Sequence, residues 1–392
     1  MGIDVGKAAH YGVAIDASGA VVRQWRIGND ESSLRRAVTW AKQRQGVIIV
    51  DQLGGLATLL LRVCWELAVP TAYLHGTAMA HARDFYAGEG ESDPKDAFVL
   101  ADVARAHPKR VAWLEPTPEE HAELALLCSF DEDLAADATR LTNRLRMVLA
   151  TYSPDLERAF GERVASPAGL GLLQQYPSRE ALLRAGTQRV AAVLKELGAK
   201  EALVFARQLV TAAEAQTVTL GGAGRAEQLV RELVQQLRGV LQRRQVLEKD
   251  IAALFFGRPE AGILVSLPGI GTRLGARILN EIGEVRRCPS AGHLASDAGL
   301  GPASWRSGTS LRHDAVRHLG NQRLKTALFQ GALASLGHQP SRAYYDRKRQ
   351  EGKNHQQAIL CLARRRVDVL FAILTRGEPY RAQPPARRPQ AA

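Results

Sequence analysis

Two short apolar runs that end in an aspartate constrain the fold of the N-terminal third of the chain. Asp4 follows the run at residues 1–3, and Asp51 follows the run at residues 47–50. Short runs rich in apolar and β-branched residues are typical of buried strands. We therefore expect an α/β domain in which two buried strands carry carboxylates.

Two further aspartates, Asp93 and Asp96, stand at the start of a helical pattern at residues 96–106. Their spacing of three places both carboxylates on one helix face, and Ser92 or Asp93 is expected to cap the helix. Several carboxylates in one place repel each other and resist joint ionisation. A divalent cation relieves that conflict, and oxygen ligands suit Mg²⁺. The candidate metal ligands are Asp4, Asp51, Asp93 and Asp96.

The order of the expected strands and helices indicates which α/β fold the N-terminal third adopts. Three strands come first, and helices then alternate with strands as far as about residue 107. The strands are expected at residues 1–5, 11–15, 21–27, 47–51 and 71–74, and the helices at residues 31–44, 56–67 and 96–106. Three meandering strands followed by this alternation are typical of an RNase H-like (RuvC-like) domain.

The middle of the chain is expected to be helical. Residues 118–160 and 225–256 carry apolar side chains at spacings of three and four, which predicts two long helices. They would pair as an antiparallel or intermolecular coiled coil, or belong to an ordinary helical-bundle core. Proline and glycine break the helical pattern between them.

We expect a RuvC-like domain at residues 1–115, a helical coiled-coil oligomerisation region at 116–258, a mostly helical domain at 259–376 and a disordered basic tail at 377–392. The fold class is thus α/β plus all-α.

The positive charge is concentrated at the C-terminal end. Residues 301–392 hold 17 Lys and Arg against 5 Asp and Glu, whereas the first 300 residues hold 35 of each. A polyanionic partner is the natural interpretation, and the alternative is a soluble basic tail.

The cysteines and the hydropathy exclude several classes of protein. The four cysteines lie far apart without a CxxC pair, which argues against a zinc site and a disulfide framework and fits a reducing cytosol. No apolar stretch approaches the roughly 18–20 residues that span a membrane. Charged residues in the first strand argue against a signal peptide. We expect a cytoplasmic protein that makes no membrane contact.

Residues 267–272, followed by the apolar pattern at 274–279, resemble a helix-hairpin-helix. Gly269 and Gly271 permit a tight turn whose amides face outward, and such a turn binds phosphate without distinguishing bases. The alternative is an ordinary packing corner between two helices.

A loop of small residues at 298–310 contains Ser307. A serine in a basic, glycine-containing loop is a candidate nucleophile toward a phosphodiester, with nearby cations stabilising charge on the phosphate. The alternative is an ordinary Ser-Gly loop. Arg364, Arg365 and Arg366 lie in a helical pattern and are expected to contact phosphates. The basic residues around the loop are Arg306, Arg312, Arg317, Arg323 and Lys325.

The motifs at residues 2–7, 92–97, 267–271 and 298–308, in that order, resemble those of the DEDD transposases of the insertion-sequence 110 type, the bridge-RNA-guided recombinases. The resemblance covers about residues 2–375. It implies a RuvC-like domain, a coiled-coil middle and a C-terminal domain with a catalytic serine. The family's acidic tetrad falls on Asp4, Asp51, Asp93 and Asp96, with Asp51 standing where the family usually has glutamate. Its serine falls on Ser307, with Ser304 and Ser310 as neighbours that could compete for the role.

The resemblance also implies a mechanism and partners. The tetrad would hold Mg²⁺, with Mn²⁺ as a substitute, and the Ser307 hydroxyl would form a 5′-phosphoserine bond to DNA. The expected partners are double-stranded DNA, a structured non-coding RNA that selects the sequence by pairing, and further copies of the chain. A homodimer is the minimum, because one subunit supplies the tetrad and another the serine, and a tetramer is expected to hold two DNA molecules. The protein would be bacterial and associated with the nucleoid.

Three alternatives remain at this point. A RuvC-type nuclease would need only the tetrad and water, so that Ser307 would be dispensable. A sugar kinase of the actin-like fold also opens with Gly-Ile-Asp-x-Gly, but it leaves the basic C-terminal third unexplained. An inactive DNA-binding remnant would not need to keep all four acidic positions and Ser307.

Overall fold

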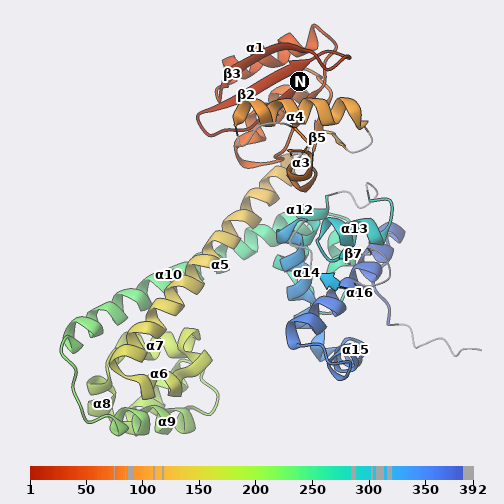
Figure 1. The fold of residues 1–392 in the computed structure, drawn as a ribbon. Coiled ribbons are helices and arrows are strands. Elements are labelled where there is room, and N and C mark those ends of the chain that lie inside the picture. The colour runs from red at the N-terminus through yellow and green to blue at the C-terminus, as the bar shows by residue number, and fades with distance from the viewer. Residues whose placement is uncertain are drawn as a thin grey trace, which may run out of the picture. The chain divides into compact units, whose positions relative to one another are not determined.

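The computed structural model describes residues 1–74, 76–83, 85–86, 92–108, 111–116, 119–283, 288–301, 303–305, 313–315 and 320–382. The chain forms two compact units (Figure 1), one built essentially from Met1–Glu119 and one that contains the long helices and nearly everything after them. The expected mixed α/β N-terminal part and mostly helical remainder are both confirmed. None of the described helices is both long and apolar enough to cross a membrane.

A mixed sheet forms the centre of the first unit. Among the described residues it has six strands in the order β3-β2-β1-β4-β5-β6. β1 runs antiparallel to β2 and parallel to β4, and β4 runs parallel to β5. The strands are β1 (Gly2–Asp4), β2 (Ala9–Ile15), β3 (Val21–Gly28), β4 (Ile48–Val50), β5 (Thr71–Tyr73) and β6 (Ala112–Leu114). β6, which pairs with β5, was not expected from the sequence.

Helices cover both faces of this sheet, because β4 is apolar on both sides. Ile48 and Val50 pack into one core with residues of α1 (Glu31–Lys42) and α2 (Thr58–Glu66). Ile49 packs into a second core with residues of α3 (Gly76–Arg83) and α4 (Asp93–Ala106). A short 3-10 turn, η1 (Gly55–Ala57), precedes α2.

Two helices of 34 residues each, α5 (Glu119–Tyr152) and α10 (Ala223–Phe256), run in opposite directions in the second unit. Leu149, near the end of α5, shares a core with Val230 near the start of α10, and Leu124 shares another with Phe255. The expected helix at 118–160 is wrong in one respect: it breaks at Ser153, because Pro154 begins the separate helix α6 (Pro154–Phe160). Pairing with a second copy stays a prediction.

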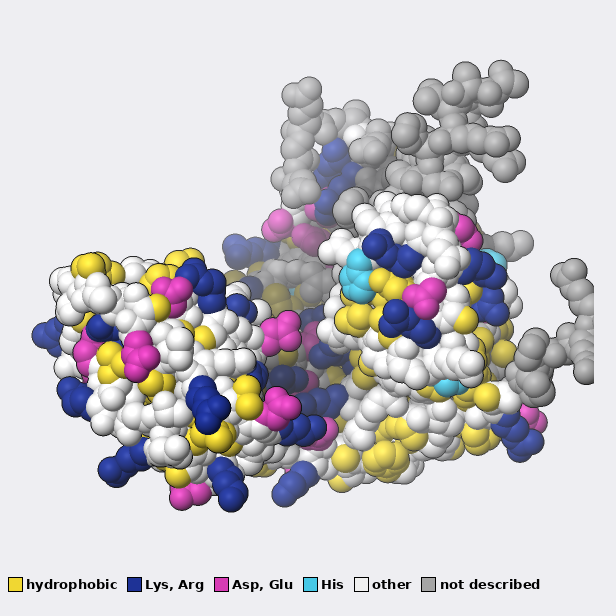
Figure 2. All heavy atoms as spheres, turned by 90° about the horizontal axis from the view of Figure 1, so that it is seen from below, with side chains coloured by type: hydrophobic (Ala, Val, Ile, Leu, Met, Phe, Trp, Pro, Cys, Tyr) yellow, Lys and Arg dark blue, Asp and Glu magenta, His cyan; other side chains and the backbone are white. Residues whose placement is uncertain are grey.

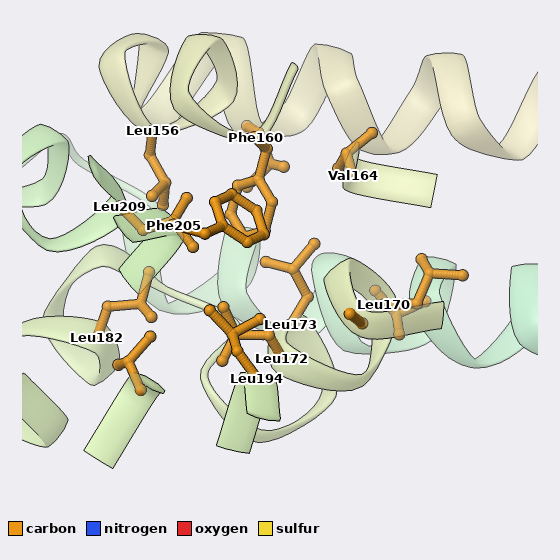
Figure 3. Packing of buried hydrophobic residues seen from close by; sticks show 14 of the residues in the cluster. Leu156, Phe160, Val164, Leu170, Leu172, Leu173, Leu182, Leu194, Phe205 and Leu209 are labelled. Atoms are coloured by element: carbon orange, nitrogen blue, oxygen red, sulfur yellow. The ribbon is translucent and has the colours of Figure 1, made fainter. Parts of the chain in front are cut away.

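Short helices close a core around one end of the long pair (Figure 3). Phe160 of α6 meets Phe205 edge to face at 5.9 Å between ring centroids, and leucines from the neighbouring helices surround them. This part contains η3 (Gly161–Ala165), α7 (Pro167–Gln175), α8 (Arg179–Glu196) and α9 (Ala202–Ala215).

The other end of the long pair packs into the C-terminal helices. These are α11 (Glu260–Val265), α12 (Thr272–Ile282), α13 (Ala291–Asp297), α14 (Gln322–Ala334), η5 (Ser335–Gly337), α15 (Gln339–Gln350) and α16 (His355–Arg376). A two-stranded hairpin, β7 (Ala303–Trp305) with β8 (His313–Ala315), interrupts the helical order. Residues 383–392, most of the expected tail, lie outside the described part.

A buried ionic contact fixes α10 and α12 against α5. Asp131, 3% exposed, accepts two hydrogen bonds from the Arg244 guanidinium at 2.9 and 3.1 Å. Arg273 of α12 lies 3.8 Å from the same carboxylate, and Arg277 pairs with the adjacent Glu132 at 2.7 Å. Two parallel N–H to oxygen bonds orient an arginine more strictly than one contact does.

We predict that Asp131→Ala lowers the free energy of unfolding by about 3–5 kcal/mol, because it leaves buried guanidinium charge without its partner. Asp137→Ala is the matched control on the same helix, since it removes an exposed pair with Arg140 and should cost less than about 1 kcal/mol. Urea titration of the helical circular dichroism measures both. Equal, small losses would contradict a stabilising role for the Asp131 contact.

Candidate functional site

Asp4 and Asp51 lie side by side at the same end of two neighbouring parallel strands. Ile3 of β1 is paired with Val50 of β4, and each aspartate is the next residue along its strand. Parallel pairing with this register places both carboxyl groups at the carboxyl ends of their strands.

Helix α4 brings the other two aspartates to this edge because it crosses β1 at very close range. A Cβ atom on Gly2 would lie 2.1 Å from the carbonyl oxygen of Ala97 and 2.7 Å from the amide nitrogen of Ala101, so only glycine permits the crossing. Asp93 begins α4 and is exposed, whereas Asp96, one turn on, is buried. Ser92 occupies the cap position, but its side chain makes no capping hydrogen bond.

The electrostatics show that the four carboxylates interact. Burial, together with the charges of Asp51, Asp96 and Asp93 in that order, raises the pKa of Asp4 to about 6. Burial also raises the pKa of Asp51, and Asp96 adds to that effect. A carboxyl group whose pKa rises for these reasons lies among uncompensated negative charge.

Arg83, the last residue of α3, stands within this acidic cluster. Its Nη2 atom donates to Oδ2 of Asp96 at 2.7 Å, and its charge opposes the rise in pKa of both Asp4 and Asp51. Arg83 was not among the expected site residues, because no helix was expected at residues 76–83 and no motif marks a lone arginine as the neighbour of distant aspartates.

The cluster also contains oxygens that accept no hydrogen bond. Oδ1 of Asp51 and Oδ1 of Asp96 are both buried in this state. Across the described part of the chain, no group of three or more acidic, histidine or cysteine side chains is arranged to hold a metal ion. The structure therefore brings the four carboxylates into one neighbourhood without closing them around a common point.

A second glycine and a histidine shape the turn after Asp4. A Cβ on Gly6 would meet the carbonyl oxygen of Ala9 at 2.2 Å, and the Gly6 amide donates to Nδ1 of the buried His10 at 3.1 Å. Burial lowers the pKa of His10, so its ring is a neutral acceptor here. The spacing of Gly2, Asp4 and Gly6 thus has a physical basis, whereas His10 carried no recognisable signal in the sequence.

Gly269 and Gly271 lie in the turn between α11 and α12, in different environments. Gly269 has φ +82° and packs against α14, where a Cβ would lie 2.5 Å from the carbonyl oxygen of Gly331. Gly271 is exposed, and a Cβ there would meet nothing within 4 Å. Gly269 therefore has a packing reason to be glycine, and Gly271 presents the open side of the turn.

Buried Arg366 holds this turn from behind by donating a hydrogen bond to the carbonyl oxygen of Pro268. Burial lowers the pKa of Arg366 to about 10. The phosphate contact expected for the arginine run at 364–366 therefore does not extend to Arg366. Its two neighbours lie nearer the surface, where Arg364 pairs with Asp368 at 2.6 Å.

Basic side chains gather on the face over α15 (Figure 2). Tyr344 is the aromatic centre of this group, with Arg347 and Arg365 each 4.9 Å from its ring centroid and Lys348 at 5.7 Å. The ring of Tyr344 attracts these cationic groups and so groups their positive charges on this face.

The first turn of α14 carries two more of the expected nucleic-acid contacts. The side chain of Arg323 is 59% exposed and lies 3.6 Å from Glu132, and burial lowers the pKa of Lys325. The candidate nucleophile Ser307 and the candidate phosphate contacts Arg306, Arg312 and Arg317 lie outside the described residues.

Asp4→Asn is predicted to stabilise the metal-free protein above pH 6. The raised pKa means that ionised Asp4 disfavours the folded state, so this loss of stability develops between pH 4 and pH 6 and is complete above pH 6. Asparagine is neutral throughout. In the presence of a chelator, the melting temperature should rise by about 2–4 °C at pH 7.5 and by less at pH 4, after allowance for partial exposure. Exposed Glu31→Gln is the control, and a gain that did not depend on pH would argue against charge repulsion.

A matched glycine pair separates packing from surface effects in the α11–α12 turn. Gly269→Ala should cost about 2–4 kcal/mol of unfolding free energy, because it combines a positive φ with a backbone clash. Gly271→Ala should change stability by less than about 0.5 kcal/mol. Chemical denaturation of both variants tests this, and similar losses at the two positions would refute the assignment.

Comparison with known proteins agrees with this architecture. Residues 1–154 match the transposase family profile of the DEDD IS110 type, and residues 261–346 match the profile of the transposase IS116/IS110/IS902 family. The chain is 40% identical to the insertion element IS110 uncharacterized 43.6 kDa protein of Streptomyces coelicolor, covering 98% of this chain and 96% of that protein.

Two further relatives match over almost the same length. The insertion element IS116 uncharacterized 44.8 kDa protein of Streptomyces clavuligerus is 37% identical over 98% of this chain and 96% of that protein. The insertion element IS900 uncharacterized 42 kDa protein of Mycobacterium paratuberculosis is 35% identical over 95% and 94%. This chain therefore belongs to the IS110 family of transposases, which are DNA-recombining enzymes.

Proposed function

We propose that the first unit is an RNase H-like catalytic domain in which Asp4, Asp51, Asp93 and Asp96 hold Mg²⁺, with Mn²⁺ as a substitute. One observation carries this proposal: Asp4 and Asp51 end adjacent parallel strands, and Asp96 reaches the same edge from a helix that crosses β1. The strand order, with a three-strand meander leading into parallel β4 and β5, supports it.

The residues of the cluster fit a hard divalent cation. All the donors are carboxylate oxygens, the preferred ligands of Mg²⁺. Burial and the neighbouring carboxylates raise the pKa of Asp4, and the Oδ1 atoms of Asp51 and Asp96 are buried acceptors without a hydrogen bond. The chemistry that Mg²⁺ supplies in such a site is polarisation of the scissile phosphate. Asp51 reaches one methylene less than the glutamate expected at that position in the family.

We propose Ser307 as the nucleophile of DNA cleavage. Its hydroxyl oxygen attacks phosphorus, the bond to the 3′-oxygen breaks, and the proton lost by serine is balanced by the one gained at the 3′-hydroxyl. The product is a 5′-phosphoserine bond, and attack by a new 3′-hydroxyl reverses the step. Because each step exchanges one phosphodiester for another, the bond energy is conserved and no ATP is required. This is transesterification with strand transfer.

We propose that the protein itself recognises the shape and the phosphates of the nucleic acid and does not read its sequence. The exposed turn at Gly271, the first turn of α14 and the basic face over α15 offer amides and cations, which bind phosphates and carry no sequence information. We propose that a structured RNA encoded by the element selects double-stranded DNA by pairing, at the element ends and at the target. The contacts proposed here are Gly269, Gly271, Arg306, Arg312, Arg317, Arg323, Lys325, Arg364 and Arg365.

We propose that the long helices also contribute to oligomerisation, with a homodimer as the minimum and a tetramer in the complex that joins two DNA molecules. Large apolar side chains remain exposed on both helices of the described pair, including Met147 on α5 and Val246 on α10. An open groove of about 320 Å³ is lined by Met147 of α5 and Leu229 of α10. Apolar surface of this kind is typical of protein interfaces.

Of the two alternative enzymes suggested by the sequence, the sugar kinase and the hydrolytic nuclease, family membership leaves only the nuclease. The full-length relatives are insertion-element proteins, which removes the sugar kinase. A hydrolytic nuclease with the same carboxylates remains, and it would release nicked DNA without a covalent intermediate.

We predict that Ser307→Ala abolishes a covalent protein–DNA adduct and leaves DNA binding largely intact. The reaction contains the full chain, Mg²⁺, labelled element-end DNA and RNA transcribed from the element's flanks, and a denaturing gel measures the adduct. Ser304→Ala and Ser310→Ala are the matched controls, because they remove neighbouring hydroxyls from the same loop.

An adduct that forms with the wild type and both control variants but not with Ser307→Ala would support the serine mechanism. An adduct lost in Ser304→Ala or Ser310→Ala instead would move the nucleophile to that residue. Nicked DNA without an adduct, equal in all four proteins, would favour the hydrolytic nuclease.

A further inference from the structure

Arg83 and Asp96 form a direct ion pair within the acidic cluster. The guanidinium of Arg83 donates to Oδ2 of Asp96 at 2.7 Å, with the two side chains 29% and 10% exposed. Arg83 ends α3 and Asp96 lies in the first turn of α4, so the pair joins two helices over one face of the sheet. The contact is direct, mostly shielded from water and close to the charges of Asp4 and Asp51.

A divalent cation that binds Asp96 would bring a second positive charge close to the guanidinium of Arg83. Arginine keeps its proton in proteins, so Arg83 cannot become neutral. A divalent ion and a guanidinium that share one carboxylate repel each other, and low solvent exposure strengthens that repulsion. Movement of Arg83 away from the carboxylate of Asp96 would relieve that repulsion.

The other carboxylate oxygens of the cluster also favour competition between Arg83 and a metal ion for Asp96. Asp96 gives one oxygen to Arg83, while its other oxygen and one of Asp51 are buried without hydrogen bonds. With Arg83 in place, no three of the described carboxylates are arranged to hold a metal ion. The side chains needed for the site are present, and one of them is bonded to an arginine instead.

We infer that Arg83 is the resident cation of the metal-free cluster and that it competes with the catalytic divalent ion for Asp96. This inference rests on the proposed function, since it assigns a regulator to the proposed metal site. Because coupling between binding sites is reciprocal, a ligand that draws Arg83 away from Asp96 tightens metal binding as much as the metal tightens binding of that ligand. A phosphate of the bound nucleic acid is such a ligand, because guanidinium groups pair with phosphates in two-point contacts.

The rival explanation is that Arg83 supports the metal site by orienting Asp96 from behind. Partners of that kind increase metal affinity, and their removal weakens binding. The two explanations thus predict opposite changes when the charge at position 83 is removed.

The experiment measures Mn²⁺ binding to the full chain without DNA or RNA, from the electron paramagnetic resonance signal of free Mn²⁺. Arg83→Met removes the charge and keeps much of the length of the side chain. It should tighten binding about tenfold, within the usual range of coupling between sites. Arg83→Lys keeps the charge and should remain within about threefold of the wild type.

Arg105→Met is the matched control. It breaks the ion pair between Arg105 and Asp102, which are 2.7 Å apart on α4, the helix that carries Asp96. It should leave Mn²⁺ affinity unchanged. Asp4→Asn identifies the part of the binding that belongs to the cluster. Melting curves in a chelator establish that each variant is folded.

Weaker or unchanged binding in Arg83→Met, with Asp4-dependent binding in the wild type, would overturn the competition and leave the metal site standing. Binding that does not depend on Asp4 in any variant would overturn the metal site and the competition together. A second measurement needs no variant at position 83: Mn²⁺ should speed amide exchange at Ala82 and Arg83 in the wild type. Slower or unchanged exchange there would count against displacement.

Discussion

The close crossing of α4 over β1 is the constraint on which the candidate site depends. Gly2 allows the backbone of the helix to approach the backbone of the strand to a distance that no side chain would permit. Asp96 is the residue before Ala97, whose carbonyl oxygen makes the closest approach. The carboxylate of Asp96 therefore reaches the edge where Asp4 and Asp51 end their strands. The position of the helix determines the chemistry at the edge of the sheet.

The same crossing creates the electrostatic cost of the site. Burial of Asp4 and the charges of the neighbouring carboxylates together raise its pKa, and Asp96 is itself buried. Arg83 supplies one positive charge from the neighbouring helix, which lowers that cost in the absence of a metal. Helix α4 thus places the carboxylate of Asp96, and helix α3 supplies the charge that partly offsets the repulsion.

Much of the first unit could be predicted from the sequence, because its strands are short, apolar and separated by clear turns. The four aspartates were found for the same reason, since they stand at the ends of recognisable elements. β6 and α3 were missed, as was Arg83, because their roles arise from contacts between segments distant in sequence. The break at Ser153 was missed because Leu156 and Phe160 continue the apolar spacing past Pro154. Gly269 was chosen for its turn, and its contact with α14 depends on a packing partner that local sequence cannot reveal.

The antiparallel course of α5 and α10 has a topological consequence. The chain leaves the long pair at Tyr152 and returns at Ala223, and these two residues line the same small cavity. Residues 153–222 therefore form a helical module inserted at the end of a two-helix arm. The chain enters and leaves this module at adjacent points. Leu149 and Val230 of the long helices share one core with these inserted helices, so the module and that end of the arm fold as one unit. The chain thus completes one hydrophobic core before it continues into the C-terminal helices, which pack into another.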